Sequence, residues 1–429
     1  MSSPGRVASI ATGRGGSRGG AGVRNAAAWF PLGFHAVLVV AAFVNVAWSL
    51  DHFGILSTIP HDRAFPDRPW FDGWSRWDAL WYRTIADDGY SYTPGQQSPV
   101  AFFPSYPLAM RVLGWLFGDV LIAGIFTTVI CGFAVTWLFH RWCLRHLSVA
   151  GARAAVVALL VYPYSYYLFG AVYGDAMFVV AALGAFLLLE DDRPVLAGLV
   201  GIVATAGRPV GGAVVAGLAV LMLARRGVLS ATVGAVAGAA GARMHGVVSL
   251  GRLRLDVRRL RPRDLAVALS VLGLAGYCFY LWRRFDAPLA FVEQAGVPGW
   301  DQPPGPRTWF KAYFFETMQL PQSPLNYVRL GSQAVFTVGA LALVPAVVRR
   351  FGWGYGVYTL LVVGLPAVAS KDFTGMGRYL LAAFPCYALL GDWLAHVGWL
   401  RRLRVPLLAT SVAALVVFTS AFARGYYLS

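Results

Sequence analysis

The chain has 429 residues, of which 58% are apolar and only 13% are charged, and its mean hydropathy is +0.59. Soluble globular proteins carry about a quarter charged residues, so half that share over so long a chain excludes a soluble enzyme. The 27 Phe, 19 Tyr and 15 Trp exclude a disordered chain as well. The composition therefore predicts an all-α polytopic membrane protein.

The chain begins with a polar segment and continues as a series of apolar runs. Residues 1–25 are rich in Gly, Ser and Arg and are predicted to form a disordered cytoplasmic tail. A membrane span needs roughly 20 mostly apolar residues. Eleven apolar runs follow, near residues 27–50, 118–140, 154–171, 175–190, 194–207, 209–224, 264–282, 326–348, 353–370, 379–396 and 405–423. We expect one transmembrane domain, 26–424, with about 11 transmembrane helices.

The charge distribution gives the expected orientation. If the N-terminus is cytoplasmic, the whole net charge of +16 falls on inner loops, as the positive-inside rule requires. The Arg-rich segment 225–263 is then a basic cytoplasmic segment that lies along anionic headgroups. The basic charge needs no nucleic-acid partner, and no motif for one is present. We expect a multi-pass protein of the cell (plasma) membrane.

Two long loops remain on the outer side, 51–117 and 283–325. The first is dense in Trp and Tyr, which is typical of a membrane interface. Its last part, 101–117, is predicted to be interfacial or re-entrant, because a full crossing would place the next basic loop outside.

Acidic and basic residues on the outer side gather at four places, namely the first outer loop, Asp175, Arg208 and the segment 371–378. Ionisable groups at membrane depth are costly and usually line a cavity or pair with one another. Carboxylates and arginines together suit an anionic lipid-linked substrate, because Arg binds phosphate bidentately and a carboxylate can accept a proton. We therefore expect an active site on the extracytoplasmic side.

Asp78 is the main candidate for a catalytic residue. It lies in the run from Arg76 to Ala86, which is predicted to be a short amphipathic helix. Its carboxylate could deprotonate a sugar hydroxyl as that hydroxyl attacks an activated anomeric carbon. The structural alternative is that Asp78 pairs with Arg76 or Arg83 or caps the helix.

The other charged candidates also have two interpretations. Asp175 begins an apolar run, where it could cap a helix or act as a second acid, and Asp72 is near enough to Asp78 in sequence to be another. Arg208 and Arg378 could extend to the interface or bind phosphate. The glycine-rich approach at 375–377 lets backbone come close to a ligand and favours phosphate for Arg378.

The sequence contains no Walker A motif, no Gly-x-Gly-x-x-Gly after a strand and no Asp-x-Asp pair. An activated sugar donor would therefore come from the membrane itself. No metal and no cofactor are expected.

An ordered set of motifs resembles the PIG-V-like mannosyltransferases. The motifs are Trp77-Asp78, Ile85-Ala86, Gly89-Tyr90, Ala101-Phe102-Phe103-Pro104-Ser105-Tyr106-Pro107-Leu108, Pro163-Tyr164-Ser165-Tyr166-Tyr167, Tyr173-Gly174-Asp175-Ala176-Met177-Phe178, Ala204-Thr205-Ala206-Gly207-Arg208-Pro209 and Gly377-Arg378-Tyr379-Leu380-Leu381-Ala382-Ala383-Phe384-Pro385. The resemblance covers about residues 70–400, in the family's order. The Arg-rich, Lys-poor usage fits an actinobacterial member.

This resemblance implies a fold of the GT-C glycosyltransferase superfamily, whose members use polyprenyl-phosphate sugars and an acidic residue in the first outer loop. Asp78 matches that acid. The later acid of the family is commonly Glu, whereas this chain has Asp175. Arg208 and Arg378 fall on recurrent arginines of the family and are carried over as donor phosphate ligands.

The hypothesis is an inverting transferase that moves mannose from a polyprenyl phosphate to a glycolipid or polysaccharide acceptor and forms an α-mannoside. Membrane lipids are the expected surroundings. The expected sugar or lipid contacts are Trp77, Trp81, Tyr82, Phe103 and Tyr173. The alternative is a membrane transporter or lipid flippase that uses the same polar cavity; such proteins usually carry paired broken helices, and only one broken pair, at 194–224, is found.

Overall fold

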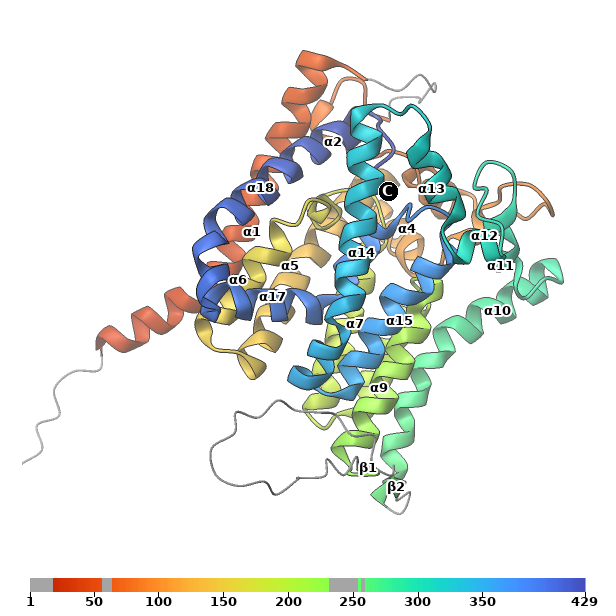
Figure 1. Cartoon of the computed structure of the whole chain (residues 1–429). Helices are drawn as coiled ribbons and strands as arrows, with labels where there is room; N and C mark the ends of the chain where they lie inside the picture. Colours follow the sequence, from red (N-terminus) through yellow and green to blue (C-terminus); the bar gives the residue numbers. More distant parts are fainter. Residues whose placement is uncertain (1–17, 56–63, 231–253, 256–258, 429) are drawn as a thin grey trace, which may run out of the picture.

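The computed structural model describes residues 18–55, 64–230, 254–255 and 259–428, and their regular structure is almost entirely helical (Figure 1). Five helices are long and apolar enough to cross a membrane, with mean hydropathies between 1.7 and 2.1 in their most apolar stretches. They are α1 (Arg18–Phe53), α5 (Val120–His146), α10 (Leu272–Phe285) with the preceding 3₁₀ helix η5 (Pro262–Val271), α14 (Pro324–Phe351) and α18 (Gly398–Ala423). The predicted class, a helical membrane protein, is confirmed.

Six further helices of the bundle are shorter than expected for a full span. They are α6 (Val149–Leu160), α7 (Asp175–Glu190), α8 (Pro194–Thr205), α9 (Gly212–Arg225), α15 (Trp353–Ala369) and α17 (Phe384–His396). The predicted run 154–171 is not one helix, because the chain before Pro163 leaves the helical conformation and continues into the 3₁₀ helix η2 (Ser165–Leu168). Likewise 379–396 divides at Pro385, in the first turn of α17.

Helix α7 lies at the centre of the bundle, in contact with α5, α8 and α9. Its sequence is apolar on all sides, as expected of a helix with no solvent-facing side. Around it, α6 packs on α17, α8 on η5 and α9 on α15. The buried start of α7, which carries Asp175, is therefore held by neighbours on every side.

The two long loops that the sequence predicts on the outer side, 51–117 and 283–325, contain short helices that pack together. The first loop contains α2 (Pro69–Asp72), α3 (Ala79–Asp87), the 3₁₀ helix η1 (Pro99–Ala101) and α4 (Ser105–Phe117). The second contains α11 (Ala290–Glu293), η6 (Gln294–Gly296), α12 (Pro306–Trp309) and α13 (Ala312–Gln319). A small core that includes Val100 and Ala290 joins them, and Ser98 N donates to Gln294 Oε1 at 2.8 Å.

The end of the molecule drawn lowest in Figure 1 carries a two-stranded antiparallel pair, β1 (Leu229–Ser230) and β2 (Arg254–Leu255). This pair brings together the two sides of the Arg-rich segment 225–263, whose residues 231–253 and 256–258 lie outside the described part. Of the predicted tail 1–25, residues 1–17 lie outside it too. Residues 18–25 belong to α1, so the helix begins earlier than the apolar run that predicted it.

Candidate functional site

The carboxylate of Asp78 faces the guanidinium of Arg378, with Asp78 Oδ2 2.8 Å from Arg378 Nη1. Both side chains are largely buried, at 14% and 9% exposure. Asp78 occupies the residue before α3 but makes no side-chain capping bond. Arg76 instead pairs with Asp72, and Arg83 pairs with Asp87. The structural alternative for Asp78, pairing or capping within its own helix, is therefore wrong.

The backbone immediately before Asp78 has an uncommon conformation. Trp77 has φ of 56°, a left-handed value that is rare for an aromatic residue and costs of order 1–3 kcal/mol. Its indole Nε1 donates to the carbonyl of Tyr426 at 3.2 Å, and its ring meets that of Tyr427 edge-on at 5.0 Å. These contacts with the C-terminal segment fix the turn that presents Asp78.

Arg378 reaches the site from α16 (Met376–Tyr379), which follows a left-handed glycine, Gly375, with φ of 87°. A Cβ atom on Gly377 would lie 2.4 Å from the ring of Tyr164. The glycine at 377 is thus required for packing against a tyrosine. The expectation that the segment 375–377 lets the backbone approach a ligand stays a prediction. The hydroxyl of Tyr162 donates to the Gly377 carbonyl at 3.0 Å.

A second ion pair joins Arg208 and Asp175, with Arg208 Nη1 2.7 Å from Asp175 Oδ1. Asp175, in the first turn of α7, is 1% exposed, and Arg208 is 9% exposed. Arg208 is extended between α8 and α9, because Pro209 disfavours the helical conformation in the residue before it. The helix break predicted at this point is therefore what brings Arg208 to Asp175.

Aromatic rings connect the two ion pairs. The guanidinium carbons of Arg208 and Arg378 lie 4.5 and 5.1 Å from the ring centroid of Tyr379. That of Arg378 also lies 4.9 Å from the ring of Tyr173. The hydroxyl of Tyr82 interacts electrostatically with all four charged groups. Burial raises the pKa of this hydroxyl far above the usual value, although both arginines lower it. The four charged groups thus form one cluster.

The cluster leaves hydrogen-bonding capacity unused. Neither ion pair has the angles of a hydrogen bond, and Arg378 Nε, both carboxylate oxygens of Asp175 and Ser105 Oγ are buried atoms without a hydrogen-bond partner. Buried polar atoms without partners are rare in folded proteins and often mark a place for a ligand or water. The cluster therefore contains donors and acceptors, on Arg378, Asp175 and Ser105, that no described protein group satisfies.

Helix α4 connects the two sides of this cluster. Its first residue, Ser105, donates its N–H to the carbonyl of Ala206 at 3.0 Å, two residues before Arg208. Arg111 donates to the carbonyls of Ala86 and Asp87 at 2.5 and 2.9 Å, and so caps the C-terminal end of α3. The same helix exposes apolar side chains, including Trp115, which is 90% exposed.

The other predicted residues lie apart from the two pairs or have structural contacts. Asp72 is fully buried, 2.7 Å from Arg76, and accepts a hydrogen bond from Phe65 N, so it anchors α2. Phe103 is buried between the rings of Tyr277 and Phe291. Trp81 stacks on Phe102 and meets Trp300.

Tyr173, predicted to contact sugar or lipid, is fully buried. Its hydroxyl accepts from the N–H of Asp78 and donates to the carbonyl of Arg76, both at 3.2 Å. Tyr82 is 5% exposed, whereas Trp77 is half-buried. Of the predicted contacts, Trp77, Tyr82 and Tyr173 therefore lie at the cluster. Tyr173 holds the backbone of Asp78 through its hydroxyl.

Sequence reasoning missed Tyr379, Gln333 and the C-terminal segment 426–428. Gln333 is fully buried; its Nε2 donates to the Leu428 carbonyl at 2.9 Å and its Oε1 accepts from Gly377 N at 3.4 Å. The position of Gln333, a polar amide within the apolar run 326–348, could have indicated a buried hydrogen-bonding role. Nothing in the sequence marks residues 426–428.

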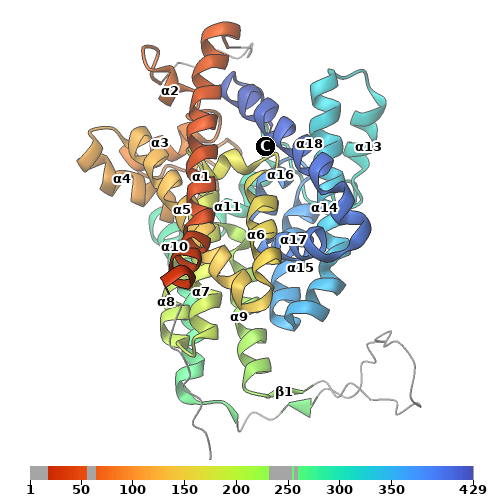
Figure 2. The same ribbon diagram turned by 90° about the vertical axis from the view of Figure 1, so that its left-hand side faces the viewer.

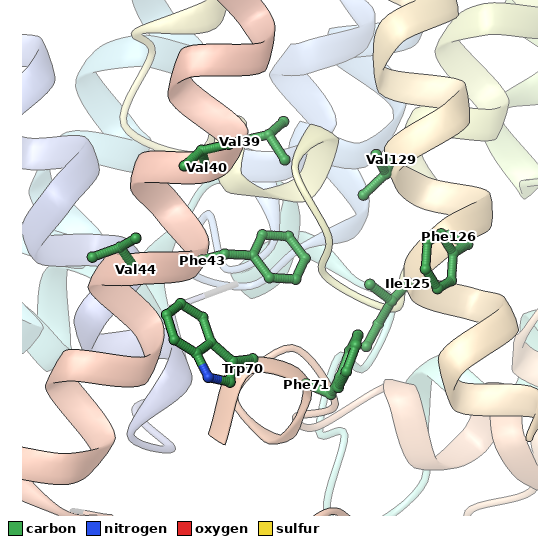
Figure 3. Close-up of a pocket in the computed structure, with 9 residues that line it drawn as sticks. All are labelled: Val39, Val40, Phe43, Val44, Trp70, Phe71, Ile125, Phe126 and Val129. Carbon is green, nitrogen blue, oxygen red and sulfur yellow. The ribbon is translucent and has the colours of Figure 1, made fainter. Parts of the chain in front are cut away.

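Two cavities lie outside the cluster. One, of about 360 Å³, opens between α1, α2 and α5 and is lined only by apolar and aromatic side chains, with Phe43 pointing into it and Trp70 and Phe71 at its edge (Figure 3). The other, of about 160 Å³, lies between the start of α14 and the C-terminal segment. Within the described residues, no three His, Cys, Asp or Glu side chains are placed to share a metal ion.

No family model matches the chain, and no curated protein matches it in sequence. Solved structures that resemble it include two of an oligosaccharyltransferase from Archaeoglobus fulgidus. One is tethered to an acceptor peptide containing the NVT sequon, and the other, named AglB, is in complex with an inhibitory peptide and a dolichol-phosphate. Their sequence identities are 13% and 14%; each alignment covers 92% of this chain and 56% of the other, with a TM-score of 0.46. The chain thus spans about half the length of these proteins, and its assignment as a helical membrane protein rests on its own helices.

Proposed function

We propose that the protein is a membrane glycosyltransferase that moves mannose from a polyprenyl phosphate to a glycolipid or polysaccharide acceptor, as a PIG-V-like member of the GT-C superfamily. The observation that carries the proposal is the contact between Asp78 and Arg378, 2.8 Å apart at one end of a membrane-type helix bundle. It joins a proton acceptor to a phosphate-binding side chain, which are the two groups that such a transfer needs.

In the proposed reaction, Asp78 accepts the proton of the acceptor hydroxyl as its oxygen attacks the anomeric carbon. The bond from that carbon to the phosphate oxygen breaks, and its electron pair leaves with the phosphate. One displacement inverts a β-linked donor to an α-linked product. Arg378, whose Nε has no partner in the described structure, binds the phosphate and stabilises the developing charge, with Arg208 beside it.

The ion pair also gives the largely buried carboxylate of Asp78 a counter-charge before substrate binds. A buried carboxylate without a counter-charge would be destabilising. When a donor phosphate binds, Arg378 would interact with both the phosphate and the carboxylate. Asp175 would keep Arg208 in place rather than accept the proton, since the pair is nearly fully buried.

The test is transfer by the full-length protein purified in detergent, with synthetic polyprenyl-phosphate mannose labelled in the sugar and a set of glycolipid and polysaccharide acceptors. We expect a labelled product whose linkage is α. Asp78→Asn should lower kcat by about 10²- to 10⁴-fold, the usual contribution of a positioned general base. The matched control is Asp87→Asn, because Asp87 lies at the end of α3 and its side chain is 43% exposed. Among the described residues, the carboxylate of Asp87 forms an ion pair with Arg83 alone.

Two results would contradict the proposal. One is Asp78→Asn with the same kcat as Asp87→Asn. The other is an absence of transfer in detergent, together with movement of the intact labelled lipid across the bilayer of proteoliposomes. The second result would support a transporter that uses the same charged cluster.

A further inference from the structure

The polar cavity of about 160 Å³ lies where the start of α14 meets the C-terminal segment. Its polar lining comes from Gln322, Ser323, Asn326 and Arg329 on one side and from Tyr426 and Tyr427 on the other. None of the residues assigned above to acid–base chemistry or phosphate binding lines it. It is therefore a separate place from the cluster of Asp78, Arg378, Asp175 and Arg208.

The walls of this cavity are fixed. The Leu428 carbonyl accepts from Gln333, and the Ala423 carbonyl accepts from Arg76 Nε at 2.8 Å, so the C-terminal segment is held at both ends. On the α14 side, Ser323 Oγ accepts from the Asn326 N–H and Asn326 Nδ2 donates to Gln322 Oε1 at 2.7 Å. Because these walls are already held by hydrogen bonds, a ligand would bind there with a smaller entropic cost of ordering the protein.

Arg329 places a positive charge in the cavity. Its Nε donates to Asn326 Oδ1 at 3.0 Å, its Nη1 to the Tyr427 carbonyl at 3.4 Å, and its guanidinium carbon lies 5.8 Å from the Tyr427 ring. These partners are neutral, and none of the described carboxylates forms an ion pair with Arg329. By contrast, Arg208 and Arg378 each face a carboxylate.

The start of α14 adds to the positive potential. The N-terminal end of a helix carries a partial positive charge from its free N–H groups, and the first turn of α14 contains no acidic residue. Arg329 follows in the second turn of the same helix. Its planar array of N–H groups matches the oxygen geometry of phosphate.

The cavity adjoins the backbone that presents Asp78. Tyr426, in its wall, accepts the hydrogen bond from the Trp77 indole, and the ring of Tyr427 meets the ring of Trp77. The wall of the cavity therefore contacts the turn at Trp77 through Tyr426 and Tyr427.

We propose that this cavity binds the phosphate group of an amphiphile, with Arg329 as its principal ligand. The amphiphile is either a polyprenyl phosphate, at a position distinct from the donor phosphate assigned above to Arg378, or a glycerophospholipid-type acceptor. Both carry the same anionic headgroup chemistry. The inference rests on the proposed function only in taking this amphiphile to be a substrate. Binding itself requires no transfer.

The experiment measures binding of four probes to the purified full-length protein in a neutral detergent: a polyprenyl phosphate, the corresponding uncharged prenol, an anionic glycerophospholipid and inorganic phosphate. Arg329→Gln should weaken binding of at least one phosphate amphiphile about 10- to 100-fold, the loss expected for a charge-assisted hydrogen bond, and leave prenol binding unchanged. The amphiphile that loses affinity identifies the source of the headgroup. Inorganic phosphate should compete with it in the unaltered protein.

Two further variants keep the test independent of folding. Arg329→Lys should retain part of the affinity, and Asn326→Asp should lower it by placing a carboxylate beside the guanidinium. The matched control is Arg307→Gln, since Arg307 lies in the second outer loop, is 60% exposed and already pairs with Glu316. Equal affinities for all phosphate probes in Arg329→Gln and Arg307→Gln, at equal thermal stability, would overturn the inference.

The two proposals fail separately. A protein that binds a phosphate amphiphile through Arg329 but transfers no sugar would contradict the proposed function and support this site. A protein that transfers mannose, with Arg329→Gln unchanged in binding and in KM for donor and acceptor, would support the function and contradict the site.

Discussion

The ring of Tyr173 lies 4.9 Å from the guanidinium carbon of Arg378, while the hydroxyl of the same tyrosine accepts a hydrogen bond from the N–H of Asp78 at 3.2 Å. One fully buried side chain therefore supports both members of the ion pair, one through its ring and the other through its hydroxyl. The two functions can be separated by substitution.

Tyr173→Phe should keep the position of Arg378 and loosen the turn at Asp78. The hydroxyl makes two hydrogen bonds, with Asp78 N and the Arg76 carbonyl, and losing both costs about 2 kcal/mol net. We therefore expect kcat for mannose transfer to fall about 30-fold, with little change in the donor KM. Tyr173→Leu removes the ring as well and should raise that KM too. Steady-state kinetics of both variants checks this, and identical profiles for Phe and Leu would show that the ring contributes nothing.

The pair between Arg208 and Asp175 should be structural as well as functional. Arg208→Gln leaves Asp175 as an unpaired buried acid and should destabilise the fold by about 3–5 kcal/mol, whereas Arg208→Gln with Asp175→Asn should recover most of that loss. Thermal unfolding in detergent measures it. A double variant that is less stable than either single one would show that the two side chains do not interact.

Gln333 should act as a positioning residue, because its amide joins the Leu428 carbonyl to the N–H of Gly377, next to Arg378. Gln333→Leu has similar volume and removes both bonds, so we expect kcat to fall about tenfold, since two buried partners lose their bonds. Gln333→Glu keeps an acceptor for Gly377 and should recover part of the activity. Equal activity of the Leu variant and the unaltered protein would exclude the role.

Lys311 in the second outer loop should titrate near neutral pH. Burial lowers the pKa of its ammonium to about 8, although Asp372 raises it; the group donates to the Ser370 carbonyl and lies 5.0 Å from the Phe373 ring. The unfolded chain, with a lysine pKa of about 10.4, binds more protons between pH 8 and 10.4. The stability of this loop should therefore rise with pH across that window.

NMR of the protein with ¹³C-methylated lysines can follow this titration, because the chain has only one other lysine, Lys371. Lys311→Arg assigns the signal and holds a permanent charge at the position. A midpoint for Lys311 above pH 10 would contradict the expectation.

The sequence was sufficient for the class of fold and for four of its five charged candidates. Asp78, Asp175, Arg208 and Arg378 form the cluster, whereas the fifth, Asp72, pairs with Arg76 elsewhere. Long apolar runs predict membrane helices, because a helix satisfies all its backbone hydrogen bonds within lipid. Arginines and acids at membrane depth are costly unless they pair, so the sequence predicts ion pairs between them. The sequence could not say which acid meets which arginine. Asp78 has Arg76 and Arg83 nearby in the chain, yet it pairs with Arg378, because tertiary packing and not sequence distance brings the charges together.

Helix lengths were predictable to a lesser extent. Pro163 and Pro385 interrupt two of the expected spans, and their effect on a helix is local and could have been anticipated. The contribution of Tyr379, which lies against both guanidinium groups, depends on a distance that no local pattern encodes. The same holds for the carbonyls of the C-terminal segment.

Helix α4 is hydrogen-bonded at two points to segments next to the charged cluster. Ser105 N donates to the carbonyl of Ala206, near Arg208, and Arg111 donates to the carbonyls at the end of α3, the helix that follows Asp78. Helix α4 lies beside α3 at the edge of the molecule (Figure 2), and its Trp115 is 90% exposed. The backbone beside Arg208 and the helix that follows Asp78 are therefore joined through one helix, whose outward-facing side chains are apolar.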